Sequence, residues 1–269
     1  MSKERIISYA EYGEDVILYH VFRDTTDKVV WVDAGASDPW EYSVTQMFYE
    51  KGGYGINIEP RKTAFDDICE YRKRDINFCC GLGEKNGTLT FLNEATSASE
   101  EVISEYKKSG KDLNFTEIPI RTLKDVLEEA GIQDDIHFFK VDVEGMEEAV
   151  LKGADFNTFR PWICCLESSI TYDNWEKILL ENGYDLALVD EINRWYLSKD
   201  HLALKDRFRS YSDLRKLYDI HFVRRADLID KIIGWSIEGS LQGNRYYRFG
   251  RMICTPYIAI RNLFRKNRS

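Results

Sequence analysis

The chain has 269 residues, 43% of them hydrophobic and 31% charged, which is the balance of a globular protein and excludes a disordered one. Its net charge of −9 argues against general nucleic-acid binding. No run of about 18 apolar residues occurs, so the sequence predicts no membrane span. The first residues, MSKERIISYAEYGED, lack the apolar core of a secretory signal, and we expect a cytoplasmic protein.

The six cysteines include two adjacent pairs, Cys79–Cys80 and Cys164–Cys165, and none of them forms a C-x-x-C motif. That spacing argues against a zinc knuckle and against a thioredoxin-like redox pair. We therefore expect reduced thiols that pack as small hydrophobic groups, and no structural metal site.

In chain order, residues 9–24 predict an amphipathic helix, and a β-rich apolar run then begins at Val29. Further apolar runs begin at residues 54, 76, 136, 161 and 184, with helix-like segments such as 61–74 and 121–131 between them. This alternation predicts a mainly parallel sheet covered by helices on both faces. Thr122 and Asp125 approximate a capping box at the start of the later helix, and Gly131 suits its C-cap.

Two segments depart from the alternation. The turn Lys85–Asn86–Gly87 before TLTFLNE predicts a small hairpin or an edge strand. Residues 186–199 predict two strands around a turn at 190–193, so the sheet ends in an antiparallel hairpin. The predicted fold is a Rossmann-like α/β sheet of the class I methyltransferase variety, an analogy of fold alone, over residues 1–200. Residues 201–269 are charged and helical in pattern and predict a helical C-terminal appendage.

Acidic residues end the first two predicted parallel strands. The first strand ends in VDAGASDPW, with Asp33 before a turn of small residues, and the second ends in Glu59, where such folds bind ribose hydroxyls. A dinucleotide fingerprint would need G-x-G-x-x-G, but only Gly35 is present, and Asp33 and Asp38 would repel a diphosphate. S-adenosylmethionine carries an ammonium and a sulfonium group, which acidic residues attract. The sequence therefore favours this cofactor over NAD(P).

Several segments together resemble the FkbM family of S-adenosylmethionine-dependent methyltransferases, over roughly residues 8 to 170. They are YAEYGEDVIL, VDAGASDPWEYSVTQMFYEKGGYGINIEP, IRTLKDVL, FFKVDVEGMEEAVLKGA and RPWICCLES. Glu11 departs from the glutamine that the family leads us to expect. The resemblance implies methyl transfer to the oxygen of a sugar or polyketide-type hydroxyl. It also implies a cofactor site with the methionine end at Asp33, Gly35, Ala36 and Ser37, the ribose at Glu59 and Pro60, and the adenine near Cys80 and Gly81.

Three carboxylates at the ends of the later strands are candidate catalytic residues: Asp142, Glu144 and Glu167. We expect one of Asp142 and Glu144 to be the base. The carboxyl ends of parallel strands meet at one edge of the sheet, and a hydroxyl acceptor needs a group that takes its proton. Alternatively, Asp142 and Glu144 cap the following helix and complement its dipole. A divalent ion held by these carboxylates is a lesser alternative. The four histidines do not cluster, and we expect structural roles for them.

After Glu238 the chain contains seven basic residues and no acidic one. Pro256 suits a helix start, and the apolar residues that follow it fall on one face beside arginines. This pattern is typical of an interfacial helix on an anionic membrane, and equally of a helix docked on the protein body. The first reading would place the protein at the inner face of the membrane, with a lipid-linked glycan as acceptor.

The predicted function is methylation of a sugar hydroxyl, in a cell-surface polysaccharide or lipid-linked glycan, with S-adenosylmethionine as cofactor. The alternatives are an O-methyltransferase of a small natural product of polyketide or macrolide type, a non-catalytic Rossmann-like binding module, and an NAD(P) oxidoreductase. The expected partner is a glycan or small-molecule hydroxyl acceptor and not a nucleic acid.

Overall fold

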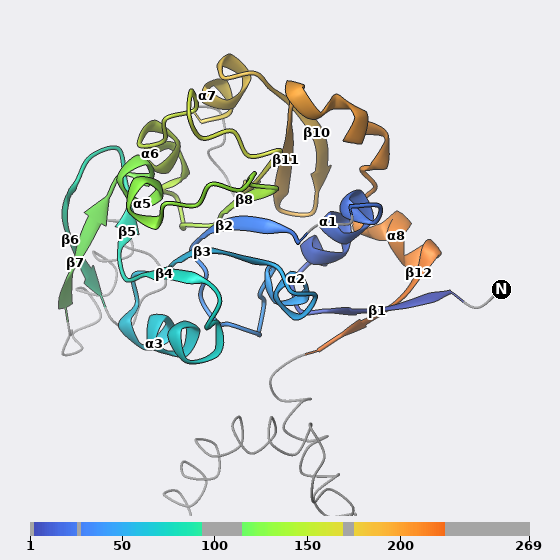
Figure 1. The fold of residues 1–269 in the computed structure, drawn as a ribbon, viewed down its shortest axis with the longest axis horizontal. Helices are drawn as coiled ribbons and strands as arrows, with labels where there is room; N and C mark the ends of the chain where they lie inside the picture. The colour runs from blue at the N-terminus through green and yellow to red at the C-terminus, as the bar shows by residue number, and fades with distance from the viewer. Residues whose placement is uncertain (1–2, 26–27, 93–114, 169–174, 224–269) are drawn as a thin grey trace, which may run out of the picture. The chain divides into compact units, whose positions relative to one another are not determined.

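The computed structural model describes residues 3–25, 28–92, 115–168 and 175–223. Within these residues a seven-stranded sheet has the order β10-β11-β9-β8-β2-β3-β4 (Figure 1). Its strands are β2 (Val30–Ala34), β3 (Tyr54–Ile58), β4 (Ile76–Phe78), β8 (Phe138–Val141), β9 (Ile163–Glu167), β10 (Tyr184–Asp190) and β11 (Asn193–Ser198). β11 runs antiparallel between β9 and β10, whereas β4, β3, β2, β8 and β9 are mutually parallel. The predicted Rossmann-like sheet with a terminal antiparallel hairpin is confirmed.

Both faces of the sheet are covered, which is why β2 and β8 are buried along their whole lengths. One face packs Val32, Phe139 and Cys164 in a core with residues of α5 (Leu123–Ala130), α6 (Glu147–Lys152) and α7 (Glu176–Glu181). On the other face Phe138 stacks on Trp31 and meets Phe48 of α2 (Gln46–Glu50). Side chains that alternate along each strand therefore point to one helical layer or the other.

Both ends predicted for the helix at residues 121–131 are confirmed. The Thr122 side chain accepts a hydrogen bond from the Asp125 N–H at 3.1 Å, and Gly131 ends α5 in the left-handed conformation with φ of 63°. The other predicted helical segment forms α3 (Lys62–Tyr71).

The apolar run that begins at residue 76 does not form one strand. It divides into β4 and the short β5 (Gly81–Leu82), which belongs to a separate three-stranded sheet of order β5-β7-β6. The strand β7 (Phe115–Arg121) was not predicted, and it separates β5 from β6 (Gly87–Leu92). The turn at residues 85–87 therefore leads into an edge strand, as predicted, but it does not close a hairpin between β5 and β6.

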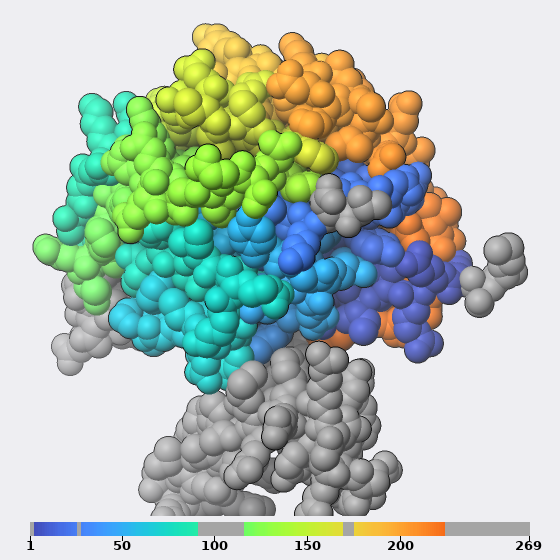
Figure 2. Space-filling view, in the orientation of Figure 1, coloured from blue at the N-terminus to red at the C-terminus, as the bar shows by residue number. Residues whose placement is uncertain are grey.

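The N-terminal residues differ from the expected amphipathic helix. The helix α1 (Glu14–Phe22) is shorter, and every residue in it except Tyr19 is buried, so it has no polar face. Before it, β1 (Glu4–Ser8) pairs with β12 (Tyr218–Phe222), a segment expected to be helical. Figure 2 shows the blue residues of β1 and the orange residues of β12 against each other.

Between β11 and β12 lie the 3₁₀ helix η1 (Lys199–Arg207) and α8 (Tyr211–Leu217). The chain divides into two units, residues 1–221 and 222–269, and nearly all of the second lies outside the described residues. The predicted division at residue 200, the appendage and the interfacial helix after Pro256 therefore stay predictions. In the described part of the chain, no helix is long and apolar enough to cross a membrane.

Candidate functional site

A cavity of about 420 Å³ opens at the carboxyl ends of the parallel strands. β2 lies there between β3 and β8, where the chain connections leave in opposite directions and a crevice forms. The cavity brings together all eleven residues that the sequence predicted for cofactor and catalysis: Asp33, Gly35, Ala36, Ser37, Glu59, Pro60, Cys80, Gly81, Asp142, Glu144 and Glu167. Their grouping is a finding of the structure, whereas the role of each stays a prediction.

The turn after β2 requires a glycine. Gly35 has φ of 83°, and a Cβ atom there would lie 1.9 Å from the backbone oxygen of Asp142. The N–H groups of Gly35 and Ala36 donate to the Ile58 carbonyl at 3.0 and 3.2 Å, and the Asp142 N–H donates to the Ala34 carbonyl. The tips of β2, β3 and β8 are thus tied closely together around the base of the cavity.

Glu59 joins the two loops that line the expected ribose end. Its side chain is buried, and its Oε2 accepts a hydrogen bond from the Ser37 N–H at 2.8 Å. Its Oε1 accepts from the N–H and Nε of Arg61 at 2.8 and 2.9 Å, and the Arg61 guanidinium also donates to Ser37 Oγ. A carboxylate oxygen can accept two hydrogen bonds, so Oε2 retains capacity for a ribose hydroxyl. Sequence reasoning identified Glu59 but missed Arg61.

The expected adenine end of the cavity has apolar walls. Cys80 and Gly81 lie at the start of β5, and Leu89, Ile118 and Ile120 of β6 and β7 face the same cavity. Aliphatic side chains of this kind suit the faces of a flat aromatic ring. The sequence signal for this wall was weak because β7 had not been recognised.

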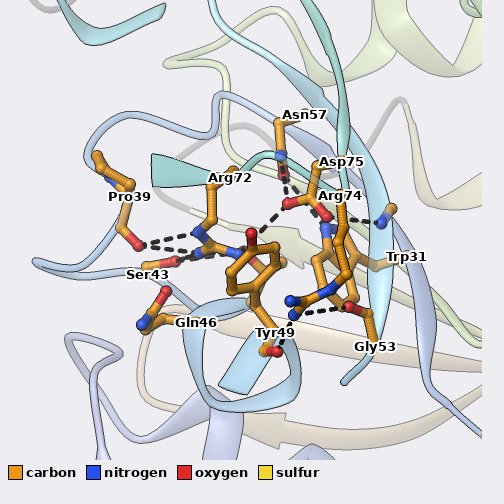
Figure 3. A network of polar contacts seen from close by, with 12 residues as sticks. Trp31, Pro39, Ser43, Gln46, Tyr49, Gly53, Asn57, Arg72, Arg74 and Asp75 are labelled. Carbon is orange, nitrogen blue, oxygen red and sulfur yellow. Dashed lines mark hydrogen bonds and ion pairs between the residues drawn. The ribbon is translucent and has the colours of Figure 1, made fainter. Parts of the chain in front are cut away.

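A buried arginine fixes the loop between β2 and α2 (Figure 3). Arg72 is 2% exposed and donates to the Pro39 carbonyl, to Ser43 Oγ at 2.8 Å and to Thr45 Oγ1 at 3.0 Å. It also forms an ion pair with Asp75 at 3.5 Å. The same loop contributes Tyr42 and Val44 to the cavity wall, so Arg72 supports the site from outside.

Asp38 has a different role from the one expected. Its Oδ1 accepts hydrogen bonds from the N–H groups of Trp40 and Glu41 at 2.8 Å each, so it caps a turn. It is not among the residues that line the cavity, and the acidity there comes from other side chains.

Asp33 provides the main structural test of whether the cavity fits the predicted cofactor. It is 2% exposed, it lines the cavity, and its Oδ1 has no hydrogen-bond partner among the described residues. Burial raises the pKa of this carboxyl, and the nearby positive charges of Lys140 and Arg72 oppose the rise. A buried oxygen without a donor costs free energy that a cationic or donor group of a ligand would recover. The ammonium group of S-adenosylmethionine is such a group, so the residues present fit the predicted cofactor.

The reacting end contains an ion pair between the buried Lys140 and the partly exposed Asp142, which the sequence did not reveal. Lys140 lies opposite Asp33 in the β2–β8 register, and its Nζ is 2.9 Å from Asp142 Oδ2. Burial lowers the pKa of Lys140, but the carboxylates of Asp142 and Asp33 raise it by more. Lys140 precedes Asp142 by two residues in the strand, and this period of two could have indicated that both face the cavity.

Asp142 also shares a hydrogen bond with Glu167. Burial would raise the pKa of Asp142, but Lys140 and this hydrogen bond together lower it. Burial and the Asp142 charge raise the pKa of Glu167 to about 8. Of the two carboxyl groups, Glu167 is therefore the one that keeps its proton to higher pH.

Helix capping, the alternative role for Asp142 and Glu144, is not seen at α6, whose N-cap is Met146 and has no side-chain hydrogen bond. The helix α6 begins at Glu147, whose side chain accepts from the N–H groups of Gly145 and Val143 at 3.1 and 3.4 Å. Glu144 is exposed at the cavity with φ of 54°, an uncommon conformation for a residue with a side chain. Burial and the Asp142 charge raise the pKa of Glu144.

The N-terminal segment and the terminal hairpin form the remaining wall. The buried Glu14 accepts from Asn193 Nδ2 and from the Tyr12 N–H, both at 2.9 Å, and these three residues line the cavity beside Glu11. This is the segment whose role the sequence left open. The described histidines do not line the cavity, and the described residues include no group of three or more His, Cys, Asp or Glu side chains that could hold a metal ion.

Comparison with known proteins gives three findings. The model of the methyltransferase FkbM domain matches residues 33–186. No curated protein matches. A TehB-like SAM-dependent methyltransferase from Corynebacterium glutamicum, known from its crystal structure, is similar at 8% identity and a TM-score of 0.38, over 70% of this chain and 88% of that one. Because the family match covers more than half of the chain, this protein belongs to the FkbM methyltransferases, enzymes that use S-adenosylmethionine as cofactor.

Proposed function

We propose that the protein transfers a methyl group to a hydroxyl oxygen of a sugar. The observation that supports this best is the hydrogen-bonded pair of Asp142 and Glu167, in the same cavity as the predicted cofactor residues. An alcohol is a weak nucleophile at neutral pH, and it needs a nearby group that accepts its proton during attack. A carboxyl pair that shares one proton supplies such a group.

The residues at the cofactor end of the cavity bind S-adenosylmethionine and orient it. When bound, S-adenosylmethionine supplies an electrophilic methyl group on a positively charged sulfur. Asp33 pairs with the cofactor's ammonium group, Glu59 accepts from its ribose hydroxyls, and the wall around Ile118 covers its adenine. The glycine turn at Gly35 keeps a side chain out of this space.

At the reacting end, Glu167 is the base and Lys140 is a positioning residue. Lys140 keeps Asp142 ionised at 2.9 Å, and the ionised Asp142 in turn orients Glu167 by their hydrogen bond. In its ionised form Glu167 would take the hydroxyl proton while the acceptor oxygen bonds to the methyl carbon. The bond from that carbon to sulfur would break at the same time, with its electron pair left on the departing neutral thioether. Because the pKa of Glu167 is raised to about 8, the fraction of active base increases as the pH rises through that value.

The test is transfer of a labelled methyl group from S-adenosylmethionine to a panel of glycosides and oligosaccharides, with the product position assigned by mass spectrometry. We expect an O-methyl sugar. We also expect Glu167→Gln to lower kcat at least about a hundredfold, whereas Glu128→Gln, a change of an exposed carboxylate on α5, leaves it unchanged.

The outcomes separate the parts of the proposal. Label on nitrogen or carbon would refute O-methylation. Label only on a phenol or a polyketide alcohol would refute the sugar and favour a natural-product acceptor. Near wild-type turnover of both Asp142→Asn and Glu167→Gln would refute the assignment of the base.

A further inference from the structure

At the N-terminal segment the cavity is lined by two tyrosines on neighbouring backbone segments. Tyr12 and Tyr42 both line the cavity, and an isolated parallel bridge pairs Ala10 with Tyr42. Tyr42 is 49% exposed and has φ of 63°, which is unusual for a bulky residue. The cavity therefore has aromatic surface at its mouth, outside the predicted cofactor residues.

The lining is also rich in carboxyl groups. Glu11, Glu144, Glu167 and Asp142 line the cavity. Two basic residues line it as well: Lys140 is paired with Asp142, and Arg61, which is paired with Glu59, opposes the rise in the pKa of Glu144. The pKa of Glu167 and that of Glu144 are raised, after burial, by neighbouring carboxylates, so a further negative charge here is unfavourable.

A second observation indicates that a ligand completes the cavity. Asp33 Oδ1, which we assign to the ammonium group of the cofactor in the same cavity, is buried and has no hydrogen-bond partner among the residues that the structure describes. The cavity thus contains a buried acceptor that the described residues leave to a ligand. Hydroxyl and ammonium groups donate hydrogen bonds, whereas carboxylate and phosphate groups only accept them.

We propose that the part of the cavity beside Tyr12 and Tyr42 is the acceptor subsite, and that it takes a pyranose ring that is uncharged or carries an ammonium group while rejecting uronic acids and phosphorylated sugars. The apolar face of the ring lies on Tyr12 or Tyr42, and ring hydroxyls donate to Glu11 and Glu144. An ammonium group gains further from the aromatic faces and the carboxylates. The inference rests on the proposed function, because it names the class of sugar for the same site.

We expect the subsite to bind a neutral sugar much more tightly than an anionic one. A like charge about 6 Å away, at an effective dielectric constant of about 20, weakens binding by about a hundredfold. Solvent screening at the exposed Glu144 reduces this effect, so we expect at least about a tenfold preference against an anionic sugar.

The experiment uses three methyl glucosides that differ only at carbon 6, as CH₂OH, CH₂NH₃⁺ and COO⁻. Each is titrated by NMR into the full-length protein saturated with S-adenosylhomocysteine, at pH 7. We expect the neutral and amino sugars to bind, and the uronate to bind at least about tenfold more weakly. Glu144→Gln should reduce the difference in affinity between the neutral sugar and the uronate. Glu128→Gln on α5 should leave that difference unchanged. Tyr12→Ala should weaken binding of all three sugars, with the fold verified by an unchanged melting temperature.

Equal binding of the three sugars, tighter binding of the uronate, or no binding of any would overturn the subsite. These outcomes are distinct from failure of the proposed function, which is decided by where the labelled methyl group is found. Methylation of a uronate in preference to its neutral counterpart would leave sugar O-methylation standing and refute the charge selectivity alone.

Discussion

Replacement of Arg72 by methionine removes the buried cation that fixes the loop between β2 and α2. The change leaves the carbonyl of Pro39 and the hydroxyls of Ser43 and Thr45 without their common donor. It also leaves Asp75, whose side chain is fully buried, without its ion-pair partner. Removal of one partner of a buried ion pair lowers the free energy of unfolding by about 3–5 kcal/mol. That is a large part of the stability of a domain of this size.

Arg74 provides a matched control. It lies two residues away over the same Tyr49 ring, with its guanidinium carbon 3.8 Å from the ring centroid, but its side chain is exposed. Arg74→Met should therefore cost less than about 1 kcal/mol. Urea denaturation at pH 7, followed by circular dichroism, measures how much each variant lowers the free energy of unfolding. The comparison requires that the variants and the wild type have equal m-values.

The loss caused by Arg72→Met should also depend on pH. Burial raises the pKa of Asp75 to about 6, although Arg72 opposes the rise, so removal of Arg72 raises that pKa further. Below pH 5 Asp75 is largely protonated in both proteins and the lost ion pair matters little, whereas above about pH 6 the folded variant holds an unpaired carboxyl group. The loss should increase as the pH rises through 6. Equal losses for Arg72→Met and Arg74→Met, or a loss independent of pH, would refute the reasoning.

Three further predictions concern the site and the core. Gly35→Ala should abolish measurable binding of S-adenosylmethionine in calorimetry, because its Cβ would clash with the Asp142 carbonyl, whereas Gly87→Ala, with no atom within 4 Å of the new Cβ, should bind normally. The kcat of the wild type should rise with pH to a plateau above about 8, and Glu167→Gln should lack this rise; an identical pH profile would exclude Glu167 as the base. Cys164 and Cys165, fully buried thiols with raised pKa values, should react with a thiol reagent only on unfolding, and labelling of the native protein at either position would contradict the described core.

The parts of the fold that depend on strong local patterns could be predicted from the sequence. Apolar runs of β-rich residues specified the parallel strands, and Thr122 and Gly131 specified the ends of α5. The short strands could not be predicted in this way. β1 and β12 are stabilised by each other across the whole domain, and β7 by its partners β5 and β6, so local propensity gave little signal for them.

The candidate site was predictable where strand ends carry unusual residues. Asp33, Glu59 and Asp142 follow apolar strands, and the geometry of a parallel sheet brings such positions to one edge. Lys140, Glu14 and Asn193 were missed because their partners are distant in sequence or lie on another element. A lysine within a strand is ordinarily assigned to solvent, whereas Lys140 lines the cavity and lies opposite Asp33 in the β2–β8 register.

The bond between Glu14 and Asn193 spans 179 positions of the chain. Since β11 inserts between β9 and β10, the sheet and one wall of the cavity are complete only when that last hairpin has been synthesised. Contacts of such long range are slow to form and make the assembly of the cavity a late event in folding. A nascent or truncated chain that ends before Asn193 lacks this hydrogen bond and this wall of the cavity, so the enclosed space for an acceptor depends on synthesis of the last hairpin.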